Sequence, residues 1–161
     1  RRAVTKAPND RMVQSRGPRI DSDEAYVIGL VGELLDEEPR VGHRFDWLRG
    51  DAGTTLPVDA CFPEHRLVLE YRERQHLADR TDTFKLWDQK PTASGIPRRQ
   101  QRARHDRLRE QEIPIHGLRL LLVDADDLVH DSRGRLRRVV EEDRVILRAK
   151  LAVVVPGFPS R

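Results

Sequence analysis

The sequence predicts an α/β fold in which helices flank a central mixed sheet of four strands. The apolar patterns along the chain follow the order helix, three strands, helix, strand, helix, which is typical of a sheet covered by helices. The second and third strands must be antiparallel because their link is short. The fourth strand arrives through a helical crossover, which permits a parallel pairing. The 161 residues, 37% hydrophobic and 35% charged, suit one compact domain with tails.

The residues before the hairpin are expected to form an arm, a helix, a strand and a turn. Residues 1–20 are polar, basic and without periodicity, so we expect a flexible basic arm. Residues 21–37 place apolar side chains at helical spacing between capping residues and Pro39, which predicts an amphipathic helix. Residues 41–48 alternate between polar and apolar side chains and predict the first strand, and residues 49–55 predict a turn.

The next two strands, residues 56–62 and 66–72, are expected to form a hairpin that turns about Glu64 and His65. In this register, residues whose numbers sum to 129 lie opposite each other. Side chains alternate along a strand, so one face is expected to be core and the other to carry the polar residues. The expected core face holds Val58, Ala60, Phe62, Leu67, Leu69 and Tyr71, and the other face holds Asp59, Cys61, Val68, Glu70 and Arg72.

The C-terminal half is expected to contain two helices and one strand. A long polar loop over 77–95 precedes a largely exposed helix over 97–112, where apolar residues are sparse. An apolar run at 118–125 predicts a buried strand, and helical spacing predicts the last helix within 135–152. The expected domain organisation is a basic arm at 1–20, an α/β domain at 21–152 and a loose tail at 153–161.

Charge is unevenly distributed along a chain whose net charge is only +3. Residues 1–19 carry six Lys or Arg against one Asp, and residues 98–109 carry six Arg against one Asp. Such basic blocks suit a polyanion such as DNA or RNA. A solvated helix face together with a disordered arm remains the alternative.

Several classes of protein are excluded. The single cysteine, Cys61, excludes an internal disulfide framework and a cysteine-based zinc site, and it favours a reducing compartment, so we expect a cytoplasmic protein. No apolar run approaches the ~18 residues of a membrane helix, so no membrane partner is expected. The sequence has no glycine-rich phosphate loop and no nucleophile elbow.

The hairpin brings one carboxylate of each strand face to face. Asp59 and Glu70 would have Cβ atoms about 4.5–5.5 Å apart, where like charges are unfavourable without a neutralising partner. A divalent cation is a suitable partner, because Mg²⁺ takes oxygen ligands, usually one or two carboxylates, and keeps waters for a phosphate substrate. The alternative is that Arg72 or Arg74 bridges the pair as a structural ion cluster.

The residues around the acidic pair form a longer pattern. Asp59, Glu70 and Arg72 follow D-x10-E-x-[K/R] on a hairpin, after a helix that bears an acid, and the stretch VDACFPEHRLVLEYRERQH ends in Gln-His. A second spacing, D-x2-R-x3-I-x3-G before an apolar strand, is matched by Asp106, Arg109, Ile113 and Gly117. Over residues ~21–130, these features resemble the PD-(D/E)XK nuclease superfamily and, within it, the very-short-patch-repair-like endonuclease branch.

The resemblance implies a restriction-endonuclease-like core and hydrolysis of DNA phosphodiester bonds that depends on Mg²⁺ or Mn²⁺, in repair, restriction or mobile-element processing. Asp59 and Glu70 would be the metal ligands, with the carbonyl of Tyr71 as a third. The residues that would position the attacking water are Gln75 and His76.

Other residues carry alternatives. Glu24 matches the acid on the first helix of such nucleases and would complete the metal shell; alternatively, Asp21 and Glu24 form a capping box. His76 is alternatively a local hydrogen-bonding residue. The residues expected to hold phosphates are Arg98, Arg102 and Arg109, and Asp106 is expected to pair with an arginine.

One departure from the family pattern concerns Arg72, which stands where these nucleases usually have Lys. Arginine is a poor proton shuttle but a good phosphate clamp. A catalytically inactive nuclease-fold protein that binds nucleic acid or a partner protein is therefore a second hypothesis, and an unrelated interaction module with purely structural carboxylates is a third. DNA is the expected partner, in a nucleoid-associated cytoplasmic location, and a homodimer or a larger parent assembly is left open.

Overall fold

The computed structural model describes residues 21–73 and 90–160, which form a mixed α/β fold. In chain order the described elements are α1 (Asp23–Leu35), β1 (Arg40–Val41), β2 (Arg44–Arg49), β3 (Thr55–Pro57), β4 (Ala60–Phe62), β5 (Leu67–Arg72), α3 (Arg98–Ile115), β6 (Arg119–Asp124), the 3-10 helix η2 (Ala125–Asp127) and α4 (Val140–Val154).

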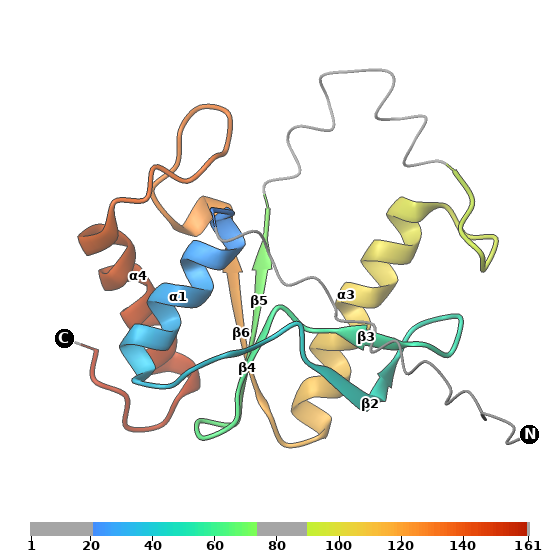
Figure 1. Cartoon of the computed structure of the whole chain (residues 1–161), viewed down its shortest axis with the longest axis horizontal. Helices are drawn as coiled ribbons and strands as arrows, with labels where there is room; N and C mark the ends of the chain where they lie inside the picture. Colours follow the sequence, from blue (N-terminus) through green and yellow to red (C-terminus); the bar gives the residue numbers. More distant parts are fainter. Residues whose placement is uncertain (1–20, 74–89, 161) are drawn as a thin grey trace, which may run out of the picture.

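Four of the strands form the expected mixed sheet, in the order β1-β4-β5-β6 (Figure 1). The pairs β1–β4 and β4–β5 are antiparallel, whereas β5 and β6 are parallel. The helical crossover through α3 connects the parallel pair, as expected. The remaining strands, β2 and β3, pair only with each other and form a separate antiparallel ribbon.

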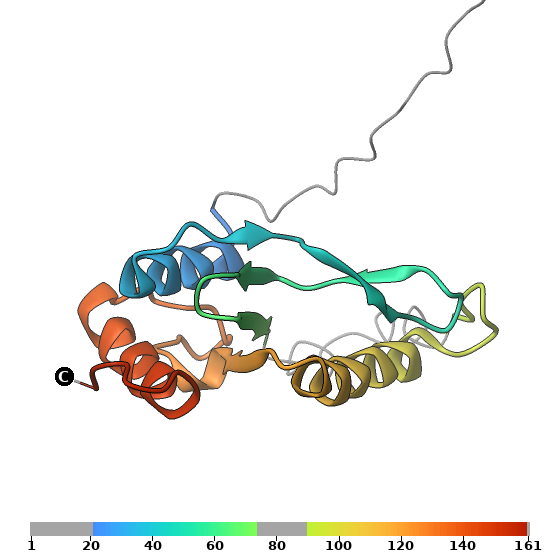
Figure 2. The same cartoon turned by 90° about the horizontal axis from the view of Figure 1, so that it is seen from below.

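Each face of the four-stranded sheet has its own hydrophobic cluster. Helices α1 and α4 contact each other and cover one face, where Phe62, Leu67 and Leu69 are completely buried. On the other face, Cys61 and Val68 belong to a smaller cluster with residues of α3, β2 and β3. Figure 2 shows α1 and α4 together at one end of the molecule, and α3 beside the β2–β3 ribbon at the other. The sheet therefore joins two packed units.

Helix α1 confirms the expected amphipathic helix but begins with a different cap. The side-chain oxygen of Ser22 accepts a hydrogen bond from the Ala25 N–H at 3.0 Å. A capping box requires its second acid at the third helical position, whereas Glu24 occupies the second position of a helix that starts at Asp23. The expected capping box of Asp21 and Glu24 is therefore wrong.

Two expected strands are each divided in the structure. Residues 41–48 give parts of β1 and β2, and residues 56–62 give β3 and β4, because the chain passes here from one sheet to the other. Gly42 has a φ of 63°, a left-handed conformation that interrupts a strand. The Gly42 N–H donates to the Asp59 carbonyl at 3.0 Å and the Val58 N–H donates to the His43 carbonyl at 2.9 Å, so the two breaks lie opposite each other. Val58 consequently joins the smaller cluster, not the expected core face.

The C-terminal elements shift relative to their expected bounds. Helix α3 continues past residue 112 to Ile115, and the buried residue that it contributes is Ile113, so the expected exposed helix is confirmed. The last helix starts only at Val140, since Leu136 forms a bridge with His130 and the chain is not yet helical. Beyond α4, Val155 is buried and Phe158 packs against the larger cluster, so these residues are packed and not loose.

None of the helices in the described ranges is both long and apolar enough to cross a membrane.

The smaller cluster should depend strongly on Ile113. Its side chain has no exposed surface, whereas that of Ile115 in the same helix is 73% exposed. Replacing a buried Ile by Ala removes apolar contacts and leaves a cavity, so Ile113→Ala should lower the free energy of unfolding by about 2–5 kcal/mol. Ile115→Ala, the matched control, should change it by less than about 0.5 kcal/mol. Urea denaturation measures both, and equal losses in the two variants would contradict the assignment of α3 to this core.

Candidate functional site

The hairpin register places Asp59 and Glu70 side by side. Ala60 pairs with Leu69, and the two following pairs keep the same register, so the expected alignment is confirmed. One step beyond Ala60 and Leu69, the Asp59 N–H donates to Glu70 Oε1 at 3.3 Å, and the Tyr71 N–H donates to Asp59 Oδ2 at 2.7 Å. Each carboxylate is therefore held by the main chain of the facing segment.

Burial makes this pair electrostatically costly. Glu70 is only 9% exposed, and its burial, followed by the negative charge of Asp59, raises its pKa to about 8 even though Arg109 acts in the opposite direction. Burial also raises the pKa of Asp59, while the hydrogen bond from the Tyr71 N–H and the charge of Arg109 act to lower it. Two acids with raised pKa values thus lie next to each other.

Glu24 belongs to the same electrostatic environment. Its pKa is raised to about 7, first by burial and then by the charges of Asp59 and Glu73. Helix α1 therefore carries a third carboxyl group, whose pKa is affected by the charge of Asp59 in the hairpin pair. An acid on the first helix was expected near this pair. Both burial and the nearby negative charges therefore disfavour the ionised form of Glu24.

The cation that contacts the pair is Arg109 of α3. Its Nε lies 3.4 Å from Glu70 Oε2, and its Nη1 lies 3.2 Å from Asp106 Oδ1, so the expected pairing of Asp106 with an arginine is confirmed. The Nη2 group also donates to the Pro57 carbonyl at 3.0 Å. Arg109 was expected to hold a phosphate, but here its guanidinium is engaged inside the protein and its side chain is only 16% exposed.

Arg72 does not bridge the carboxylate pair. Its guanidinium forms an ion pair with Glu110 of α3, so the alternative in which Arg72 is the structural bridge is wrong; Arg74, the other residue of that alternative, lies outside the described residues, and Arg109 is the arginine next to Glu70. Sequence reasoning missed this because Arg109 is close to Glu70 only in the folded chain. The D-x2-R spacing was the one signal that pointed to it.

The remaining expected site residues are placed only in part. Arg98 and Arg102 are exposed and lie in the N-terminal half of the same helix as Arg109. The side chain of Tyr71 is buried in the larger cluster, and its carbonyl remains a predicted ligand. Gln75, His76 and Arg74 lie outside the described residues.

The two carboxylates suit a Mg²⁺ site that retains bound waters better than a site in which the protein supplies every ligand. Within residues 21–73 and 90–160, no group of three or more His, Cys, Asp or Glu side chains is arranged to hold a metal ion. Mg²⁺, however, commonly binds through one or two carboxylates and retains waters. Asp59 and Glu70 fit that donor set, and a divalent cation would offset the burial and the neighbouring negative charges that raise their pKa values.

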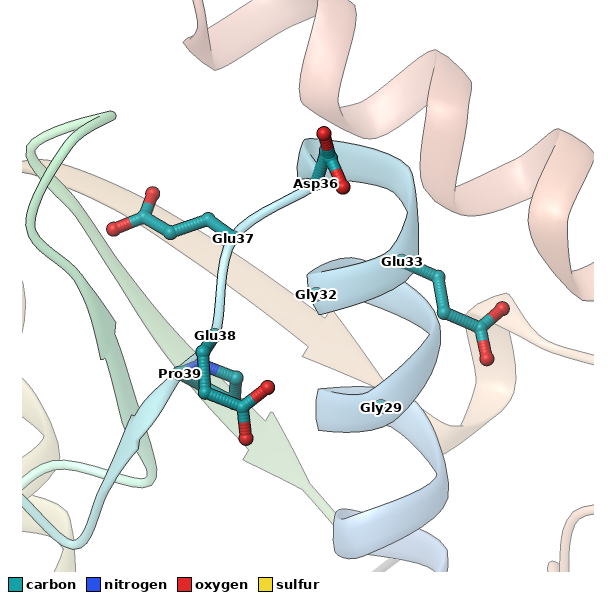
Figure 3. A pocket seen from close by; sticks show the side chains of 7 residues that line it. All are labelled: Gly29, Gly32, Glu33, Asp36, Glu37, Glu38 and Pro39. Carbon is teal, nitrogen blue, oxygen red and sulfur yellow. The ribbon is translucent and has the colours of Figure 1, made fainter.

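A separate open pocket of about 370 Å³ lies at the other end of α1 (Figure 3). Its lining includes none of the candidate site residues, and consists of Gly29, Gly32, Glu33, Asp36, Glu37, Glu38 and Pro39. One of these acids is already used by the fold, because Glu37 accepts hydrogen bonds from the Glu64 N–H at 2.8 Å and from the His65 side chain at 2.7 Å. Glu37 therefore helps to hold the β4–β5 turn.

No protein-family model matches the chain, and no curated protein or solved structure matches it significantly.

The raised pKa of Glu70 predicts that stability depends on pH. Between pH 4.5 and about 8, the folded protein keeps a proton on Glu70 that the unfolded chain has released. A folded state that binds more protons loses stability as the pH rises. In metal-free protein the free energy of unfolding should therefore fall across this range, and Glu70→Gln should reduce the slope.

Urea denaturation at several pH values tests this dependence. Glu24, whose pKa is raised to about 7, contributes in the same direction, so some slope should remain in Glu70→Gln. The matched control is Glu141→Gln, at a side chain that is 86% exposed, and it should keep the wild-type slope. An unchanged slope in Glu70→Gln would show that Glu70 titrates normally in the folded protein.

Proposed function

We propose that the chain is a Mg²⁺- or Mn²⁺-dependent endonuclease that hydrolyses DNA phosphodiester bonds, built on a restriction-endonuclease-like core of the PD-(D/E)XK type. The observation that carries the proposal is the pair of carboxylates, the half-buried Asp59 and the buried Glu70, held side by side by main-chain hydrogen bonds at the end of a hairpin. Such a pair is unfavourable by itself and becomes favourable with a divalent cation.

The arrangement of the sheet supports the same proposal. The acids lie where the antiparallel β4–β5 hairpin meets the parallel β5–β6 pair, after a first helix that bears Glu24. This is the order of elements that the resemblance implies for such nucleases. The two acids of the D-x10-E pattern, Asp59 and Glu70, thus lie in direct contact in the folded chain.

In this mechanism Asp59 and Glu70 would hold the metal, and the predicted third ligand is the Tyr71 carbonyl. A bound divalent cation would activate a water molecule and stabilise the charge that develops on the phosphate. Glu24 would contribute a further carboxylate from α1. The exposed Arg98 and Arg102 would contact backbone phosphates, which positions the nucleic acid without reading its sequence.

Arg72 would act through its charge, because a guanidinium stays protonated at any pH compatible with folding. Its ion pair with Glu110 holds it against α3. It can therefore help to neutralise the phosphate or fix α3, but it cannot shuttle a proton. The resemblance assigns the positioning of the attacking water to Gln75 and His76, which lie outside the described residues.

A second candidate function is favoured by the two arginines. Arg109 already pairs with Glu70, and Arg72 replaces the usual Lys and pairs with Glu110. A nuclease-fold protein without catalysis, which binds nucleic acid or a partner protein, would tolerate both features. For either function we propose a cytoplasmic, nucleoid-associated location, with DNA as the partner and a homodimer or larger assembly as an open arrangement.

The proposal predicts metal-dependent cleavage. Purified protein should nick supercoiled plasmid DNA with Mg²⁺ or Mn²⁺, and EDTA should abolish the nicking. Loss of an outer-shell partner of a metal ligand already costs about 10–100-fold, so Asp59→Asn and Glu70→Gln should each reduce the rate by at least about 100-fold. Gel electrophoresis of the relaxed form gives the rates.

Glu141→Gln is the matched control, because it neutralises an exposed carboxylate of α4 and should leave the rate unchanged. Cleavage that survives both hairpin substitutions would overturn the proposed site. Salt-sensitive DNA binding with no cleavage would support the second candidate, since binding to phosphates weakens as salt rises.

A further inference from the structure

Arg109 occupies an unusual position for a helix residue in a strongly basic segment. It lies in α3, yet its guanidinium contacts both segments that carry the acidic pair. It donates to the carbonyl of Pro57, two residues before Asp59, and its Nε lies 3.4 Å from Glu70 Oε2. These contacts join α3 to the hairpin at the candidate site.

The contact with Glu70 is the longest of the polar contacts of the Arg109 guanidinium described above, at 3.4 Å. Its Nε–H is already donated to Pro57 O at 3.3 Å, so Glu70 receives the positive charge of the guanidinium and no hydrogen bond from that group. The Nη1 and Nη2 groups are held by Asp106 at 3.2 Å and by Pro57 at 3.0 Å. Arg109 can therefore lose its interaction with Glu70 and still be anchored.

The charges around Arg109 do not balance. Besides burial, the charges of Asp59 and Asp106 raise the pKa of Glu70 and the charge of Asp106 raises the pKa of Asp59, while the charge of Arg109 lowers both pKa values. One guanidinium against three carboxyl groups leaves a net negative charge when all are ionised. A divalent cation would therefore be attracted to the pair, but Arg109 would repel it.

We propose that Arg109 is a positioning residue that acts as the resident counterion of the Asp59–Glu70 pair, and that it weakens divalent-cation binding there by competing for Glu70. This inference rests on the proposed function. Binding of the cation would weaken the Arg109–Glu70 interaction. By thermodynamic linkage, that interaction must weaken cation binding by the same free energy. Arg109 therefore sets the metal concentration at which the site fills.

The test measures Mn²⁺ binding to the full chain by isothermal titration calorimetry, without nucleic acid. Arg109→Gln removes the charge but keeps a group that can donate to Pro57 O, and it should bind Mn²⁺ about tenfold more tightly than wild type, within the range usual for coupled sites. Arg109→Lys restores the charge and should bind within about threefold of wild type.

Arg144→Gln is the matched control. Arg144 forms ion pairs with Glu33 and Glu141 on the other side of the molecule from α3, so the same loss of charge there should leave Mn²⁺ affinity unchanged. If Arg109→Gln does not fold, Arg109→Met gives the same comparison, because it keeps an unbranched side chain without the charge.

The outcomes separate this inference from the proposed function. If Arg109→Gln and Arg109→Met bind Mn²⁺ no more tightly than wild type, the counterion role is overturned. If wild type binds Mn²⁺ and Asp59→Asn does not, the metal site of the proposed function is still supported. Absence of Mn²⁺ binding in wild type and in every Arg109 variant would overturn both. Tighter binding in Arg109→Gln, restored by Arg109→Lys, supports the inference.

Discussion

The geometry of the candidate site depends on two hydrogen bonds that cross the end of the β4–β5 hairpin. The Asp59 N–H donates to Glu70 and the Tyr71 N–H donates to Asp59. Main-chain ladder bonds end at Ala60 and Leu69, and side-chain carboxylates take their place. These hydrogen bonds fix the positions of both carboxylates. They also hold Glu70 where it is buried and Asp59 where it is half-buried, and burial disfavours the ionisation of both acids.

Helix α3 connects this strained pair to the smaller hydrophobic cluster. Ile113 anchors the helix in that cluster, while Arg109, one turn earlier, reaches the Glu70 carboxylate. Gly117 ends the helix region with a φ of 73° and turns the chain into β6. The D-x2-R-x3-I-x3-G spacing therefore describes one connected structure: an oriented guanidinium, a buried anchor and a left-handed turn that only glycine adopts easily.

Local sequence patterns predicted the hairpin. They did not predict the features of the fold that depend on contacts between residues far apart in the sequence. The period of two and the short link determined the register, and that register alone placed Asp59 opposite Glu70. The transfer of Val58 to the other cluster was not predictable, because it follows from the division of two strands opposite Gly42. Likewise, Arg72 is near Glu70 in sequence, yet Arg109 became its counterion through the packing of α3.

The two arginines narrow the chemistry that the described part of the chain can supply. Arg109 and Arg72 remain charged at all relevant pH values, so they can stabilise negative charge but cannot accept a proton. The carboxyl groups differ, since the pKa of Glu24 is raised to about 7 and that of Glu70 to about 8. Near neutral pH these groups can exchange protons when no cation is bound, whereas a bound cation would favour their ionised forms. Of these four side chains, only the carboxylates of Glu24 and Glu70 can accept a proton, so charge stabilisation and proton exchange fall to different residue types.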